Sequence, residues 1–318
     1  QTQFVRGFAP SEWQAIVDNP LHPLENKSIQ GQYPLGSTFK PVVLVAALEE
    51  GIVEPETKLT CHGEYQLGNH VYRCWKKRGH GELDLYQALV QSCDIYFYQL
   101  GQKLGVDLMS RYSQFFRLGS RTLIRLNNEA GGLVPTAQWK RRRFGVPWQK
   151  GEDLVLAIGQ GFLLATPMQM ATLYAAIANG GKFLRPRVVL RVEDPEGAII
   201  KNVGPEIVGR LDLSESTISF IQKALEGAVN EPRGTGRAAQ LRGELRGIRV
   251  AGKTGTAQVV RAPEDEEEEQ DESEVPYEFR DHAWFATYAP AEAPEIVVVV
   301  LVEHGGHGGS AAAPLARQ

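Results

Sequence analysis

Three short motifs lie far apart in this sequence, and they constrain its fold because they supply complementary parts of one chemistry and must meet to act. They are Ser37-Thr38-Phe39-Lys40, Ser92-Cys93-Asp94 and Lys253-Thr254-Gly255-Thr256, separated by roughly 55 and 160 residues. Ser37 is a candidate nucleophile with a candidate base, Lys40, three residues later, a spacing that shares one helical face. The chain must therefore fold so that both serines lie beside Lys253.

The requirement for a neutral base explains why the third motif should adjoin the first. A lysine is a poor general base at its unperturbed pKa of about 10.4. Burial and a second nearby cation both disfavour the charged form of Lys40, so we expect Lys253 beside it. Ser92 can relay a proton, because a hydroxyl both donates and accepts. An ionised Asp94 can only accept hydrogen bonds. Three roles are open for it: contact with the substrate, pairing with Lys40, which would favour the charged lysine, or a structural hydrogen bond.

The third motif is suited to substrate binding. We expect a strand at residues 250–260, on which Lys253, Thr254 and Thr256 hold a substrate carboxylate. Gly255 would remove a side chain that obstructs a ligand lying along the strand edge. The backbone N–H groups of Ser37, at a helix N-terminus, and of Thr256 form a candidate oxyanion hole.

The order of elements predicts a mixed α/β domain of the α+β type, with an antiparallel sheet flanked by helices. We expect helices at 37–51, 85–102, within 153–179 and at 214–229, and strands at 250–260, 283–288 and 296–302. The last strand is a continuous apolar run, which predicts burial. A mainly helical subdomain, about 52–240, is inserted between the Ser37 helix and the late strands. Gly234-Thr235-Gly236 should shape a loop near the cleft, and His304 and His307 should lie in a surface loop.

Composition limits the function classes. The chain has 318 residues, 42% apolar, with mean hydropathy −0.26, as in soluble globular proteins. It lacks an apolar run of about 18 residues, so we predict no membrane span. Nine acidic residues between Glu264 and Glu274 predict a disordered acidic loop at 263–279. The chain begins with Gln and carries no signal peptide, so we expect a fragment of something longer.

The three motifs resemble the S-x-x-K, serine-polar and K-T-G pattern of penicillin-binding proteins and serine β-lactamases. Longer stretches narrow the resemblance to the transpeptidase domain of the penicillin-binding protein 2 family, the elongation-type class B enzymes. They lie at 33–41, 74–81, 92–99, 159–161 with 165–167, and 252–258. The Trp75-Lys76-Lys77 stretch and the Ser-x-Asp form point to this family rather than to the division homologue, which is expected to carry Ser-x-Asn.

The resemblance implies a peptidoglycan D,D-transpeptidase of rod elongation. Ser37 would attack the D-Ala-D-Ala stem and form an acyl-enzyme that a neighbouring stem amine resolves; β-lactam antibiotics would acylate the same serine. The full-length protein would lie at the periplasmic face of the bacterial inner membrane, with a membrane glycosyltransferase partner; its N-terminal anchor and pedestal are absent from this soluble fragment. Catalysis would need no cofactor, and no nucleic acid would bind. The alternatives are a serine β-lactamase and a β-lactam sensor or scaffold without turnover.

The three cysteines and one histidine predict a second site. Cys61, Cys74, His80 and Cys93 follow the spacing C-x12-C-x5-H-x12-C. Three thiolates and one imidazole complete a closed structural zinc site. The alternatives are one disulfide, such as Cys61 to Cys74, with Cys93 as a buried thiol, or His62 or His70 as the nitrogen ligand. If zinc is bound, Cys93 couples it to the neighbouring Ser92 and Asp94.

Overall fold

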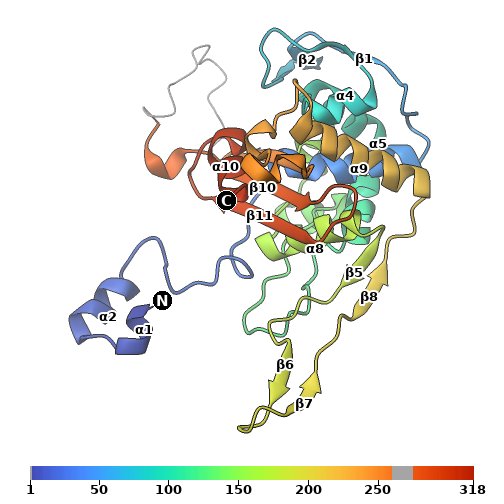
Figure 1. Cartoon of the computed structure of the whole chain (residues 1–318). Helices are drawn as coiled ribbons and strands as arrows, with labels where there is room; N and C mark the ends of the chain where they lie inside the picture. The colour runs from blue at the N-terminus through green and yellow to red at the C-terminus, as the bar shows by residue number, and fades with distance from the viewer. Residues whose placement is uncertain (1, 260–274) are drawn as a thin grey trace.

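The computed structural model describes residues 2–259 and 275–318, and it places a small antiparallel sheet against a larger, mainly helical part (Figure 1). The helices are α1 (Thr2–Arg6), α2 (Pro10–Val17), α3 (Lys40–Glu49), α4 (Leu85–Val90), α5 (Asp94–Phe115), α6 (Ala137–Phe144), α7 (Lys150–Ala157), α8 (Pro167–Ala178), α9 (Glu215–Asn230) and α10 (Ala313–Ala316). The strands are β1 (Leu59–Cys61), β2 (Glu64–Leu67), β3 (His70–Arg73), β4 (Gly81–Leu83), β5 (Lys182–Leu184), β6 (Arg191–Glu193), β7 (Ile199–Asn202), β8 (Ile207–Arg210), β9 (Ala251–Ala257), β10 (His282–Ala289) and β11 (Ile296–Val302). The mixed α/β class expected from the sequence is confirmed.

The late strands form the sheet that carries the third motif. β9, β10 and β11 pair antiparallel in the order β11-β10-β9, with Lys253 opposite Ala286. The apolar run of β11 is not buried as predicted, because it is an edge strand of this sheet and every one of its residues stays at least partly exposed. β9 forms the opposite edge, so the K-T-G residues lie at a sheet margin beside the helices.

Helix α3 forms the centre of the molecule. Its residues from Lys40 to Ala47 are all buried, and it packs against α5 and α9. The helix expected from Ser37 begins instead with a 3₁₀ turn, η1 (Gly36–Phe39), and Lys40 starts the α-helix. Pro41 fits in the first turn of α3, where backbone N–H groups have no helical partner.

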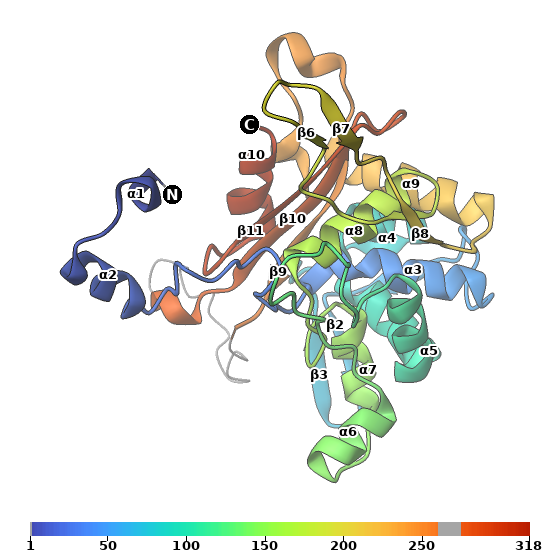
Figure 2. The same ribbon diagram turned by 90° about the horizontal axis from the view of Figure 1, so that it is seen from below.

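The helix expected at 85–102 is broken at the second motif. α4 ends at Val90 and α5 begins at Asp94, with Ser92 in the left-handed region at φ 54°. Around these helices, residues 52–240 also carry four two-stranded sheets, and the β6–β7 hairpin projects from the body in Figure 1. In Figure 2, which is seen from below, this hairpin overlaps the rest of the molecule. In the described part of the chain, no helix has both the length and the apolar character to cross a membrane.

Residues 263–274 of the expected acidic loop lie outside the described part of the chain. Its last residues, 275–279, are described and include the short 3₁₀ helix η4 (Tyr277–Phe279). The sheet continues directly afterwards, with β10 beginning at His282.

Candidate active site

Ser37, the candidate nucleophile, lies on a turn held by hydrogen bonds on both sides. The N–H groups of Leu35 and Gly36 both donate to the Gly159 carbonyl, at 3.0 and 2.9 Å. On the other side, the Tyr174 hydroxyl donates to the carbonyl of Thr38 at 3.0 Å. Because residues three apart eclipse in a 3₁₀ helix, η1 presents Ser37 on the side where α3 starts with Lys40.

Lys40 joins the first motif to the second. It is completely buried, and its Nζ donates to the Ser92 carbonyl at 2.8 Å, to Ser92 Oγ at 3.1 Å and to Asp94 Oδ1 at 2.7 Å. An ammonium has three protons, so these contacts use its whole donor capacity. Within residues 2–259 and 275–318 no side-chain hydrogen bond joins Ser37 to Lys40, and such catalytic contacts often tighten only with substrate bound.

The turn carrying Ser92 and Asp94 is strained and firmly braced. A serine in the left-handed region costs about 1–3 kcal/mol and persists only where its surroundings impose it. Trp75 supplies part of that support: its backbone N–H donates to Asp94 Oδ2 at 2.9 Å, and its indole Nε1 donates to the Ser92 carbonyl at 3.1 Å. Sequence reasoning used Trp75 only as a mark of resemblance and missed this positioning contact.

Strand β9 brings the third motif to the same place. Lys253 is fully buried, and its Nζ donates to the Thr254 carbonyl at 3.2 Å. Burial, and then the positive charge of Lys40, hold the pKa of Lys253 well below its ordinary value. Lys253 therefore lies close enough to Lys40 for the charge of Lys40 to act on it, as expected if the first and third motifs meet.

Gly255 serves a purpose different from the expected one. A Cβ at this position would lie 2.9 Å from both the Leu35 carbonyl oxygen and Thr38 Cγ2. Its bare face therefore meets η1, and the glycine is required by close packing of the nucleophile turn rather than by clearance for a ligand. Because strand residues alternate, Lys253 shares this face.

Thr254 and Thr256 present the other face of β9. Thr254 Oγ1 lies 2.8 Å from Thr235 Oγ1, so the prediction that 234–236 forms a loop near the cleft is confirmed. His307 is exposed in its loop, as expected, yet its Nδ1 lies 3.5 Å from Thr256 Oγ1. Gln160 donates to the Thr256 carbonyl at 3.0 Å. The sequence marks this residue only within the stretch 159–161 and does not predict the contact.

The two backbones expected to form an oxyanion hole run side by side. Gly36 has φ 53°, and a Cβ there would lie 2.3 Å from the Thr256 carbonyl oxygen and 3.0 Å from the Thr256 nitrogen. The residue after Gly36 is Ser37, so the amides of Ser37 and Thr256 belong to neighbouring chain segments. The candidate nucleophile Ser37, the candidate relay Ser92 and the two lysines thus converge from η1, the α4–α5 turn, α3 and β9.

The family follows from this arrangement together with comparison to known proteins. The family model described as the penicillin binding protein transpeptidase domain matches residues 5–318. The chain belongs to this family. Its fold also matches solved structures of penicillin-binding proteins.

Three relatives illustrate the match. The peptidoglycan D,D-transpeptidase MrdA of Haemophilus influenzae is 36% identical over 320 residues, which cover 99% of this chain and 48% of that protein. The structure of the complex between PBP2 and MreC from Helicobacter pylori matches with a TM-score of 0.82 at 30% identity, over 97% of this chain and 52% of that one. A ceftriaxone acyl-enzyme of penicillin-binding protein A from Mycobacterium tuberculosis matches at 0.80 and 28% identity, over 98% and 66%. The chain spans about half the length of the curated relatives it matches.

The transpeptidase domain also gathers the predicted metal ligands. One ligand atom from each of Cys61, Cys74, His80 and Cys93 lies within 4.8 Å of all the others. His80 Nδ1 is 3.5 Å from Cys61 Sγ and 3.6 Å from Cys74 Sγ. All three thiols are buried and free, so the structure contains no Cys61–Cys74 disulfide. The alternative ligands His62 and His70 are not members of this group.

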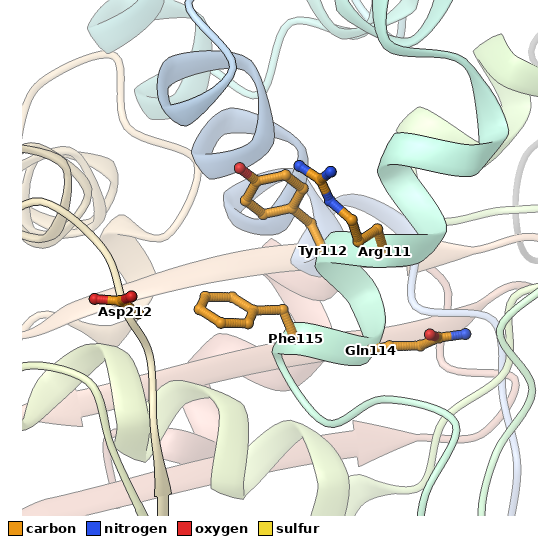
Figure 3. Close-up of a pocket in the computed structure, with 5 residues that line it drawn as sticks. All are labelled: Arg111, Tyr112, Gln114, Phe115 and Asp212. Carbon is orange, nitrogen blue, oxygen red and sulfur yellow. The ribbon is translucent and has the colours of Figure 1, made fainter.

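One hollow of the described surface lies away from these motifs. It measures about 490 Å³ and is lined by Arg111, Tyr112, Gln114, Phe115 and Asp212 (Figure 3). Arg111 and Tyr112 both contact Glu50, directly after the end of α3, whereas Lys40 begins that helix. Ten helical residues span about 15 Å, so this hollow is remote from the chemistry, and the site is defined by its residues rather than by cavity size.

Proposed function

We propose that this domain is a serine D,D-transpeptidase that cross-links peptidoglycan stem peptides through an acyl-enzyme on Ser37. The observation that carries the proposal is the set of bonds from Lys40 to both Ser92 and Asp94, made directly after the turn that holds Ser37. This cluster unites a base and a proton relay in one buried network, beside the turn that carries Ser37 as the nucleophile.

In the first half of the reaction, Ser37 Oγ attacks the carbonyl of the penultimate D-Ala and its proton passes to Lys40, which must first release one of the three protons that it donates to Ser92 and Asp94. The backbone N–H groups of Ser37 and Thr256 stabilise the oxyanion. Ser92 then delivers a proton to the departing nitrogen, the C–N bond breaks and terminal D-Ala leaves. The hydroxyls of Thr254 and Thr256 hold the carboxylate of the donor, and Lys253 lies on the opposite face of β9.

In the second half, the amine of a neighbouring stem attacks the acyl carbon. It gives up a proton through Ser92 and Lys40, the bond to Ser37 breaks and Ser37 Oγ is reprotonated. A β-lactam follows the first half only, because its cleaved ring nitrogen stays tethered and blocks the acceptor. The proposed acylation is thus the same for substrate and antibiotic.

Labelling with a fluorescent penicillin tests this function. We expect stable label on the wild-type domain and none on Ser37→Ala, with the modified peptide containing Ser37. Absence of label on Ser37 would refute the acylation step. Release of the label within seconds to minutes would instead support a serine β-lactamase.

A turnover assay separates the transpeptidase from a sensor or scaffold. A D-Ala-D-Ala peptide is offered with a D-amino acid as acceptor, and we expect an exchanged peptide and free D-Ala. A protein that is labelled by penicillin but yields neither product would be a sensor. In the full-length protein, we propose action in rod elongation at the periplasmic face of the inner membrane, with a membrane glycosyltransferase as partner. A matching structure of a peptidoglycan synthase complex, which coordinates polymerization and crosslinking, supports such a partner.

We also propose that Cys61, Cys74, His80 and Cys93 hold a structural zinc ion. A tetrahedral site with Zn–S of about 2.3 Å and Zn–N of about 2.0 Å separates sulfur from nitrogen by about 3.6 Å, which fits both measured His80 separations. The ion would supply no catalytic chemistry and would fix the β1, β3–β4 and α5 segments to one another. Elemental analysis should find one zinc per chain in the wild type and none in Cys61→Ser; absence of zinc from the wild type would end the proposal.

A further inference from the structure

A second hollow adjoins the catalytic cluster, and the proposed reaction does not use it. It measures about 330 Å³ and lies between the segment after β3 and the loop after α9. Its lining residues are Trp75, Lys76, His80, Gln91 and Arg233, and they define what is here called the side subsite.

Both walls of the side subsite are attached to catalytic motifs. On one wall, Trp75 donates to Asp94 Oδ2 at 2.9 Å and to the Ser92 carbonyl at 3.1 Å. On the other wall, Arg233 lies two residues before Thr235, whose hydroxyl is 2.8 Å from that of Thr254. The hollow therefore opens beside the turn of Ser92 and Asp94 and beside the loop that contacts Thr254.

The charge of the side subsite is one-sided. Lys76 and Arg233 line it and are exposed, and none of its five lining residues is acidic. In the described part of the chain, neither cation makes an ion pair or a side-chain hydrogen bond. Two cations facing one hollow without a counter-charge repel each other, and an anion placed between them removes that repulsion.

The chemistry of the walls suits a carboxylate on a partly apolar carrier. A guanidinium binds carboxylates in a bidentate manner, and a lysine adds a mobile positive charge. Trp75 supplies a flat apolar surface that is 58% exposed, which is high for so large a side chain. A carbon chain could lie on the indole while its terminal carboxylate meets the two cations.

We propose that the side subsite selects acyl donors that carry a carboxylate on the side group next to the reacting acyl residue, with Lys76 and Arg233 as specificity-determining residues. This inference rests on the proposed transpeptidase function and names its donor class, an acidic peptide. The same subsite favours β-lactams whose acyl side chain is anionic.

Two penicillins that differ by one group test the inference. Benzylpenicillin and its α-carboxy derivative share the ring system and the phenyl group, and only the second has a carboxylate in the side chain. Second-order acylation rate constants are measured for both on the wild type, Lys76→Gln, Arg233→Gln and the double variant. Lys77→Gln is the matched control, because Lys77 is the exposed neighbour that does not line the hollow.

We expect the ratio of the α-carboxy rate to the benzylpenicillin rate to fall about two- to fivefold in each single variant, the range for exposed ion pairs. The double variant should lose about tenfold, and Lys77→Gln should keep the wild-type ratio. Equal ratios in all proteins, or an equal fall in Lys77→Gln, would overturn the side subsite while acylation itself persists. Failure of both penicillins to label wild-type Ser37 would remove the proposed function and this inference with it.

Discussion

Gly36→Ala tests whether the contact between η1 and β9 builds the oxyanion hole. The added Cβ would lie 2.3 Å from the Thr256 carbonyl oxygen, and Cβ atoms essentially never come closer than 3.0 Å to another heavy atom. The two segments must therefore separate by at least the difference, 0.7 Å. Because β9 is hydrogen-bonded along its length to β10, the nucleophile turn should give way.

The size of the effect follows from that displacement. A misplacement of about 1 Å at a reacting centre can cost about 10²-fold in rate, and loss of one oxyanion donor costs roughly 10²- to 10³-fold. We expect acylation of Gly36→Ala to slow by about 10²-fold. Because φ is positive at Gly36, alanine at this position should also lower the free energy of unfolding by about 1–2 kcal/mol.

The assay compares this variant with Gly51→Ala. Gly51 has φ 63°, and a Cβ added there would meet nothing within 4 Å, so its substitution brings the backbone penalty without the clash. Acylation by fluorescent penicillin is measured per folded molecule, with folding followed by circular dichroism. If both variants acylate at the wild-type rate, or both slow equally, the contact between Gly36 and Thr256 does not shape the oxyanion hole.

Three further changes have expected outcomes. Lys253→Met should abolish acylation yet raise the free energy of unfolding, measured in urea at neutral pH, because burial lowers the pKa of Lys253 in the folded state. This gain in stability should shrink as the pH rises toward the pKa of an unfolded lysine, about 10.4. A gain that grows with pH would contradict the prediction. Gln160→Leu removes the donor to the Thr256 carbonyl and should cost about 1 kcal/mol of stability and slow acylation, whereas Gln160→Leu acylating at the wild-type rate would show that this bond does not position β9. Chelation of zinc-loaded protein should lower the thermal midpoint of unfolding by about 10 °C. Loss of the ion removes about 4 kcal/mol of stabilisation by binding, and each kcal/mol corresponds to about 2–4 °C. Cys61→Ser should show no such shift.

The sequence predicted the elements whose pattern is local. The α9 helix and the strands β9 and β10 appear close to their expected bounds, because amphipathic and alternating patterns need only neighbouring residues. The position of β11 at a sheet edge depends instead on strand order, and an apolar run by itself does not distinguish a central strand from an edge strand. Its predicted burial was wrong for that reason.

The candidate site divides in the same way. The sequence predicts Ser37, Lys40, Ser92 and Lys253 as site residues because each belongs to a motif with fixed spacing. The supporting contacts join residues far apart in sequence: Gln160 reaches Thr256, and Trp75 reaches Asp94. Neither contact leaves a periodic pattern, so only the fold could identify them. Gly255 is the opposite case. The sequence marks it as a site residue, but the reason for a glycine there, its close packing against η1, is visible only in the structure.

The turn at Ser92, Cys93 and Asp94 is where the catalytic and metal-ligand clusters share backbone. The Ser92 carbonyl accepts from both Lys40 and the Trp75 indole while Ser92 is in the left-handed conformation at the α4–α5 break. One residue later, Cys93 is completely buried and turns its thiol to the cluster of Cys61, Cys74 and His80. A ligand bond at Cys93 would restrain the same peptide units that aim Ser92 at Lys40, so the strain at Ser92 would be offset by the metal cluster rather than by the substrate. The proton relay would then be preorganised before any donor binds.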